Sequence, residues 1–534
     1  MSLMRATQIF STKNMTFSMI GFKYVLIPPI GLFVIILSIF LYWAGLSRGL
    51  EDGVQGVITF YLILISAFLP IICCVNRKEE GDNNNYDFFQ PGVIVAIFYY
   101  LYILIPGVHI WYNLNYISNW IQVSNERALV NYTFLVGILG IIFFGLGYRS
   151  KIASFIIPMR LKKLSHKFRR IKWPNDAFIK KIIVILISIG FVSRLYLLTK
   201  IGGVSSYTFQ FLSPSMRAEL GLRIPGILVL ASSFFDWGAL FLLLRYIVTQ
   251  KQKYITVLIV LVAIVSTYLL GGKRSDVFPF FFFPLVWYHY LRNRISFNKG
   301  LIYLFCGFIL MTSLLFIRII GPLVARSRSG DIDAVSEIVA KPMDFYLNSP
   351  ELAVFDMTMV SIRERTHILE SIGGWLNGIL NYNLSTILYL VPRSLWHDKP
   401  IFRDLGQELF RLFISDTGSA GFSVGIFAGL YVFGGLLGVL LGMAVIGIFF
   451  RSLYVIVQPW RGDPSFVFIY SIAIWIFFQF LRFGTLGFTI LFFIQKLILG
   501  TGVGLLWLYI RGQTNIFHRK NNGKQQYCNS RDIA

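Results

Sequence analysis

The chain alternates long apolar runs with shorter polar segments. A helix needs about 20 mostly apolar residues to cross about 30 Å of hydrocarbon, and twelve runs approach or exceed that length. Each run is continuously apolar, which favours helices over the alternating strands of a membrane barrel. The pattern therefore predicts an all-α fold, a polytopic membrane helix bundle with about twelve transmembrane helices. The runs lie at residues 24–43, 54–75, 93–114, 130–148, 182–198, 227–248, 254–270, 277–291, 301–320, 424–450, 465–481 and 486–510.

The composition supports an integral membrane protein. Of 534 residues, 56% are hydrophobic and 51 are Phe, more apolar surface than a soluble domain of this size could bury. The first run, from Tyr24, is long enough to span and is followed by no small-residue cleavage site, so we expect it to be retained. The four cysteines lack metal-type spacing, so neither a zinc site nor a disulfide framework is expected.

The basic residues predict the orientation. The segment 149–181 carries eleven Lys and Arg, and such segments stay on the cytoplasmic side. Because successive loops lie on alternate sides of the membrane, this segment places both termini in the cytoplasm. The net charge of +24 then reflects contact with anionic membrane lipid, and we expect no nucleic-acid partner, because no binding motif accompanies the charge.

The longest segment between predicted spans, residues 321–421, falls on the opposite, outer side. It contains Trp375 and Trp396 and balanced charge, and its segment from Ser349 begins with Pro350 in a predicted first helical turn. We expect a helical cap. The predicted organisation is nine spans within 1–320, the cap at 321–421, three spans within 422–510 and a cytoplasmic tail at 511–534.

Several cations face the outer side in this topology. The turn GGKRSD carries Lys273 and Arg274. Others come from different loops or span ends: Arg194, Arg217, Arg318 and Arg482. Each could be an anchor that reaches the interface, but as a set they could surround one anionic group. Two charged residues lie inside spans, Asp236 and Lys496. Such residues suggest function, and a structural pairing of Asp236 with an arginine is the alternative.

A second concentration of polar groups lies late in the cap. The segment VPRSLWHDKP, residues 391–400, holds Arg393, His397, Asp398 and Lys399, and Glu408 follows in IFRDLGQELFRLF. The prolines restrict the turn. This density of donors and acids suits a phosphate-bearing ligand, and ordinary ion pairs in a solvated loop are the alternative.

These residues resemble a known family. The stretch PRSLWHDKP, the GQE step at Gly406–Glu408, the glycine-rich span from Gly421 and the G-K-R-S turn at Gly272–Ser275 are similar to the bacterial oligosaccharide repeat-unit polymerases, the Wzy-type polymerases of O-antigen and capsule. The resemblance covers about residues 270–450. It implies a GT-C-like helical bundle with a long periplasmic loop, in the bacterial inner membrane.

The resemblance also implies the reaction. Such an enzyme transfers a growing glycan from undecaprenyl pyrophosphate to a lipid-linked repeat unit at the outer face, without a metal or other cofactor. Donor and acceptor are both undecaprenyl-pyrophosphate-linked oligosaccharides. Whether a chain-length regulator also binds stays open.

The charges have a chemical reason in this reaction. The leaving pyrophosphate gains negative charge, which fixed cations stabilise in the absence of a metal, each charge-assisted hydrogen bond contributing roughly 1.5–3 kcal/mol. We expect Glu408, His397 or Asp398 to remove the proton of the acceptor hydroxyl. The predicted pyrophosphate ligands are Lys273, Arg274, Arg217, Arg318, Arg393 and Lys399.

Two other functions fit the same architecture. An O-antigen ligase uses the same donor but transfers the glycan to lipid A core. A non-enzymatic flippase would move the same lipids across the membrane, but flippases typically have short outer loops and paired halves. The long cap and the lack of an internal repeat count against it.

Overall fold

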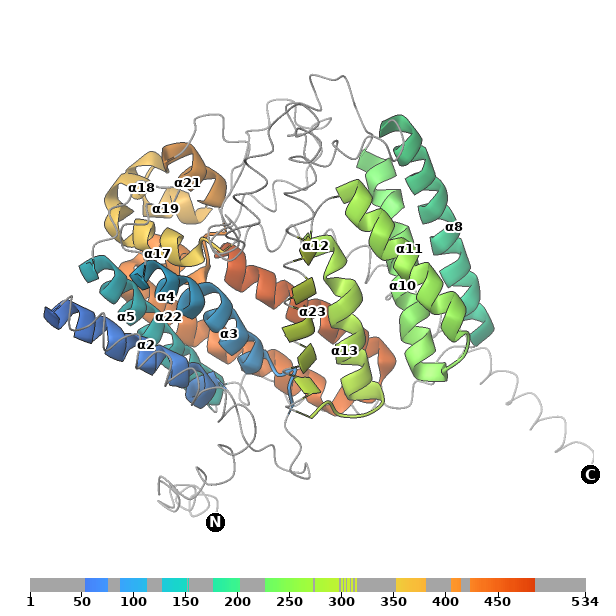
Figure 1. Ribbon diagram of the computed structural model, residues 1–534, viewed down its shortest axis with the longest axis horizontal. Coiled ribbons are helices and arrows are strands. Elements are labelled where there is room, and N and C mark those ends of the chain that lie inside the picture. The colour runs from blue at the N-terminus through green and yellow to red at the C-terminus, as the bar shows by residue number, and fades with distance from the viewer. Residues whose placement is uncertain are drawn as a thin grey trace, which may run out of the picture.

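The computed structural model describes residues 53–74, 87–112, 127–150, 176–201, 226–271, 274–296, 352–380, 405–413 and 423–485, with isolated residues at 152 and within 299–314. Within these ranges the regular structure is entirely helical (Figure 1). Seven of these helices are long and apolar enough to cross a membrane. The predicted all-helical, multi-pass membrane architecture is therefore confirmed for the described part of the chain.

The helices follow the apolar runs closely. Nine of the twelve predicted runs coincide with described helices; runs 24–43 and 486–510 lie outside the described residues, and run 301–320 is described only in isolated residues. The count of twelve thus stays a prediction. The helices of the bundle are α2 (Gly53–Cys74), α3 (Pro91–Tyr99), η3 (Tyr100–Leu104), α4 (Ile105–Tyr112), α5 (Arg127–Arg149), α8 (Asp176–Ile201), α10 (Gly226–Thr249), α11 (Lys253–Gly271), α12 (Arg274–Val277), α13 (Pro279–Leu291), α22 (Ile426–Val457), η6 (Gln458–Trp460) and α23 (Pro464–Phe483).

Two groups of helices lie side by side. The helices α2, α3, α5 and α22 share one hydrophobic core, and α10, α13 and α23 share a second with the start of α3; α8 and α11 flank the second group (Figure 1). Glycines permit the closest approaches. A Cβ on Gly147 would lie 2.1 Å from the Ala444 carbonyl oxygen, and one on Gly190 would lie 2.1 Å from the Phe235 nitrogen. Close backbone contact of this kind is the usual way membrane helices pack.

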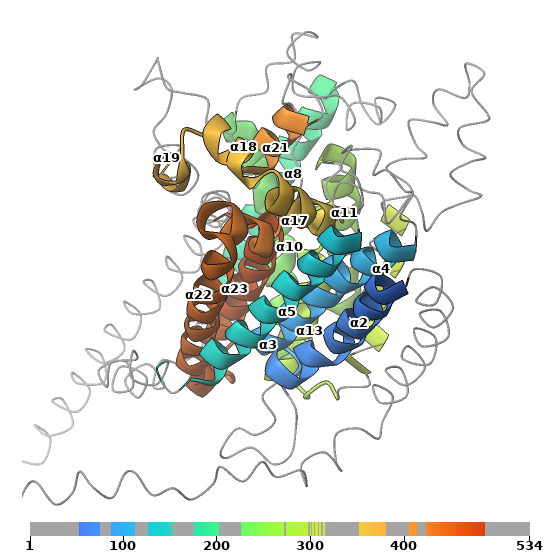
Figure 2. The ribbon, with the colours of Figure 1, turned by 90° about the vertical axis from the view of Figure 1, so that its left-hand side faces the viewer.

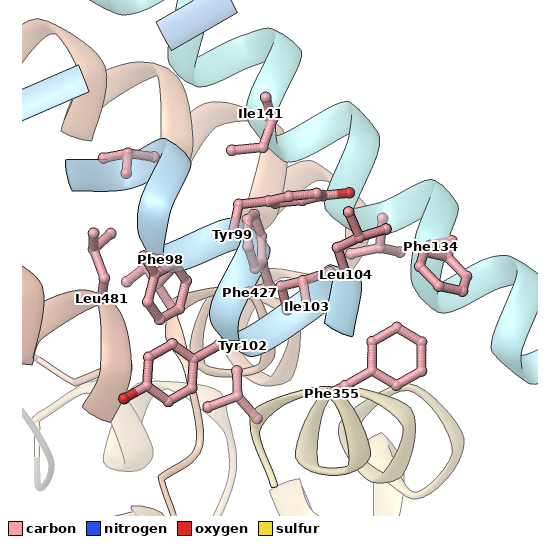
Figure 3. Packing of buried hydrophobic residues seen from close by; sticks show 14 of the residues in the cluster. Phe98, Tyr99, Tyr102, Ile103, Leu104, Phe134, Ile141, Phe355, Phe427 and Leu481 are labelled. Atoms are coloured by element: carbon pink, nitrogen blue, oxygen red, sulfur yellow. The ribbon is translucent and has the colours of Figure 1, made fainter. Parts of the chain in front are cut away.

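The third predicted span changes its winding halfway. Between α3 and α4 the π-helix η3 pairs the Ile105 N–H with the Tyr100 carbonyl. Pro106 has no N–H to donate to the carbonyl of Tyr102, so the series of α-helical hydrogen bonds is interrupted at this turn. Its aromatic residues pack into the core, where Tyr102 stacks on Phe98 (Figure 3).

The tenth predicted span is broken. Inside α22, Gly435 has φ 61° and ψ −153°, a conformation that essentially only glycine adopts. Beyond it the chain folds back, because a Cβ on Gly442 would lie 2.5 Å from the Leu430 side chain, whereas twelve residues of straight helix extend about 18 Å. Residues 426–434 therefore form a short arm packed against the long helix 436–457. The prediction of one continuous span at 424–450 is wrong at this point.

The described part of the cap consists of four short helices. Figure 2 shows them at one end of the bundle. The helices α17 and α21 pack on the 426–434 arm through Met357, Leu409 and Ala428, which share a small hydrophobic core. Their bounds are α17 (Val354–Arg363), α18 (Arg365–Ser371), α19 (Trp375–Ile379) and α21 (Leu405–Phe413).

Candidate functional site

Most of the predicted site residues lie outside the described residues. This holds for seven of the nine: Lys273, Arg217, Arg318, Arg393, Lys399, His397 and Asp398. Arg274 begins the short helix α12, and only its backbone is described. Glu408 is the one predicted site residue whose side chain can be placed, so the gathering of the cations around one anion stays a prediction.

Glu408 lies on the buried face of α21. Its side chain is only 8% exposed and forms an ion pair with Arg411 of the next turn, whose Nε donates to Oε1 at 3.0 Å. The same face carries Leu405 and Leu409, which pack on Val424 and the arm beyond it. The predicted acid is therefore near the membrane-facing side of the cap. Its carboxylate is already held by a cation.

The arm begins against the end of α23. The Gly425 N–H donates to the Arg482 carbonyl at 2.8 Å, and Arg482 Nε donates to the Ser423 hydroxyl at 2.9 Å. A Cβ on Gly429 would lie 2.2 Å from the Gly484 carbonyl oxygen, so the two backbones touch. The positive start of one helix meets the negative end of another, and this contact fixes the arm inside the bundle.

The other end of the arm is capped from above. Arg365 of α18 donates through Nε to the carbonyls of Tyr431 and Val432, at 3.2 and 3.1 Å. These carbonyls lose their helical partners because the chain turns at Gly435. A cap residue thus stabilises the helix break, and cap and arm form one structural unit.

A carboxylate that was not predicted from the sequence lies in this unit. Asp356 is in the first turn of α17, between Phe355, which packs on Phe134 with ring centroids 5.0 Å apart, and the buried Met357. Burial raises the pKa of its carboxyl from 3.8 to about 7. The sequence signal was an acid within the apolar stretch LAVFDMTMV, but an acid at a helix start is also an ordinary feature of helix ends.

Two charged residues predicted near the membrane pair with each other. Arg194 of α8 forms an ion pair with Asp236 of α10 at 2.5 Å, and Thr267 of α11 donates to the same carboxylate. Arg194 also donates to the Ser232 carbonyl at 3.1 Å. The arginine-paired interpretation of Asp236 is therefore the correct one, and Arg194 holds three helices together. Lys496 lies outside the described residues.

A second buried acid lies at the end of the bundle away from the cap. Asp87 accepts hydrogen bonds from the hydroxyls of Tyr290 and Tyr454, the shorter contact being 2.6 Å, and lies 3.3 Å from both His289 Nε2 and Arg461 Nη2. Burial alone would raise the pKa of Asp87, but the His289 hydrogen bond and the Arg461 charge lower it to about 2. The cluster joins α13, α22 and α23 to the segment before α3.

The described residues contain no group of three or more His, Cys, Asp or Glu side chains that could hold a metal ion. No protein-family model, curated protein or solved structure matches the chain.

Proposed function

We propose that the protein is a polymerase of undecaprenyl-pyrophosphate-linked oligosaccharide repeat units. It would join them into O-antigen or capsular polysaccharide at the periplasmic face of the bacterial inner membrane, by metal-independent glycosyl transfer. The motif resemblance suggests the family. The observation that supports the proposal best is the packing of cap helices α17 and α21 on the broken end of α22, which joins the cap to the apolar bundle.

Such a junction suits a lipid-linked sugar. The polyprenyl chain would lie among the apolar helices while the pyrophosphate and sugars reach the cap. Irregular backbone at membrane depth is tolerated where it is enclosed by protein or lines a cavity, and the contact between Gly425 and Gly484 is such a place.

The reaction has two demands. The acceptor hydroxyl loses its proton as its oxygen bonds to the anomeric carbon, and the bond from that carbon to pyrophosphate breaks with its electron pair. We propose that cations stabilise the departing lipid pyrophosphate, chosen from Lys273, Arg274, Arg217, Arg318, Arg393 and Lys399. The proton acceptors predicted from sequence are Glu408, His397 and Asp398.

One observation favours a transporter as the second candidate. Interrupted helices that pack end to end are typical of secondary transporters, where they form the substrate site. The arm at 426–434 meeting the end of α23 is of this kind. A flippase for the same lipids would use the cap junction to bind the headgroup without breaking a bond.

Deletion of the gene separates the three functions in cells. We expect loss of the polymer ladder, with single repeat units still attached to lipid A core or to the carrier on the outer face. Intact polymer that stays on its lipid carrier would indicate a ligase. Single units trapped on the cytoplasmic face would indicate a flippase and would contradict the polymerase proposal.

A further inference from the structure

Three features carry the inference beyond the proposed function, and all concern Asp356. The first is its exposure. Residues 354 to 361 of α17 are all buried except Asp356, which is partly exposed. On this otherwise enclosed stretch of helix, Asp356 is therefore the one residue that keeps some solvent-accessible surface, although most of its surface is buried.

The second feature is the position of Asp356 between two cores. Val354 and Phe355 belong to the core of the membrane helices, whereas Ala353 and Met357 belong to the core of the cap. Asp356 thus projects at the seam between the two. Val354 also lies against the start of the arm, since a Cβ on Gly425 would come 2.2 Å from its Cγ1. Packing on both sides holds the carboxylate in one place, as the contact of Phe355 with Phe134 illustrates (Figure 3).

The third feature is that no cation among the described residues neutralises Asp356. Within the described ranges, Asp356 forms no ion pair. The two nearest arginines along the chain are engaged elsewhere: Arg363 pairs with Glu364 at 3.3 Å, and Arg365 binds the carbonyls of the arm. The titratable side chains on the elements packed around α17 are Arg127, Tyr132, Tyr148 and Arg149 of α5, Tyr100 and Tyr102 of η3, Arg365, His367 and Glu370 of α18, and Tyr431, Arg451 and Tyr454 of α22.

This environment suits a base. Burial raises the pKa of Asp356 to about 7, and a proton acceptor works best when its pKa lies near the working pH. Glu408 has a different environment, because Arg411 holds its carboxylate and the residue lies on the buried face of α21.

We propose that Asp356, rather than Glu408, is the catalytic base that accepts the proton of the attacking sugar hydroxyl. The proposal rests on the proposed function and deepens it. The hydroxyl proton moves to the Asp356 carboxylate while the oxygen bonds to the anomeric carbon. The carbon–oxygen bond to pyrophosphate breaks with its electron pair, and the protonated Asp356 afterwards returns its proton to water.

The test uses the full-length protein in lipid vesicles with an undecaprenyl-pyrophosphate-linked repeat unit. Asp356→Asn is expected to lower kcat about 10²- to 10⁴-fold with little change in KM, while the exposed-site control Glu370→Gln keeps wild-type activity. Wild-type kcat should fall below a pH near 7, and the residual rate of Asp356→Asn should not. An Asp356→Asn rate within threefold of wild type would overturn the assignment.

Folding is controlled separately. Because ionisation of Asp356 above pH 7 opposes burial, Asn should leave the protein at least as stable as wild type at pH 8. If Asp356→Asn nevertheless misfolds, Asp356→Glu decides. An active variant whose kcat falls on acidification at a different pH from wild type supports the role. A kcat that falls at the same pH as in wild type overturns it. A wild-type protein that makes no polymer would instead contradict the proposed function itself.

Discussion

At the scale of single residues, the described charges are mostly satisfied inside the bundle. Arg194 and Asp236 pair across α8 and α10, and Arg245 of α10 binds Asp176 at the start of α8. A buried ion pair adds little net stability compared with apolar residues, but removing one partner leaves an uncompensated charge. These pairs therefore matter chiefly for which helices lie together.

The Arg194–Asp236 pair gives a stability prediction. Asp236→Ala leaves the Arg194 guanidinium buried without its carboxylate, and we expect the free energy of unfolding to fall by about 3–5 kcal/mol. Thermal unfolding in detergent measures this, with Glu370→Ala on the exposed side of α18 as the control. An Asp236→Ala melting temperature equal to that of the control would show that the pair does not hold the helices.

Asp87 gives a prediction of pH dependence. Its pKa is lowered from 3.8 to about 2 in the folded protein, so the ionised form stabilises folding. That stability is fully present above about pH 4 and is lost as the pH falls towards 2. From the shift it amounts to about 2 kcal/mol at neutral pH.

Unfolding of wild type and Asp87→Asn between pH 7 and pH 2 measures this contribution. The variant should be less stable at pH 7, and the difference should shrink on acidification. A difference that stays constant over the whole range would contradict the lowered pKa.

At the scale of elements, hydropathy predicted where helices lie but not how they bend. The apolar runs at 54–75 and 465–481 correspond to α2 and α23 within two residues at each end, because length and hydropathy are sufficient for that prediction. The reversal at Gly435 depends on a backbone angle, and the sequence FGGLLG is equally compatible with close helix packing. Asp356 was missed for a similar reason, since its surroundings come from segments distant in sequence.

Because the chain reverses at Gly435, alanine substitutions at two neighbouring glycines should affect stability differently. Gly435 has positive φ, so Gly435→Ala should lower the free energy of unfolding by about 1–3 kcal/mol. Gly434 is the matched control: a Cβ there meets no atom within 4 Å, and alanine should be neutral or slightly stabilising in the helix. Thermal unfolding of both variants checks this, and equal effects would contradict the fold-back.

At the scale of the whole molecule, the described chain has two polar regions at opposite ends. The cap and the arm lie at one end of α23 and the Asp87 cluster at the other, about 30 Å apart along a helix of this length. The ends of α5 and α2 meet at the Asp87 side, where Arg149 donates to the Ile72 carbonyl. Arg149, the first residue of the basic segment, therefore lies away from the cap, and the orientation across the membrane stays a prediction.

The product made by the purified protein tests the central claim most directly. Reconstituted in vesicles with an undecaprenyl-pyrophosphate-linked repeat unit and with EDTA present, it should convert the units into a ladder of longer lipid-linked glycans. Arg274→Ala should lose the ladder while inserting normally, because the pyrophosphate would lack one of its stabilising charges. Single units left unjoined by the wild-type protein, with or without movement across the bilayer, would contradict the account.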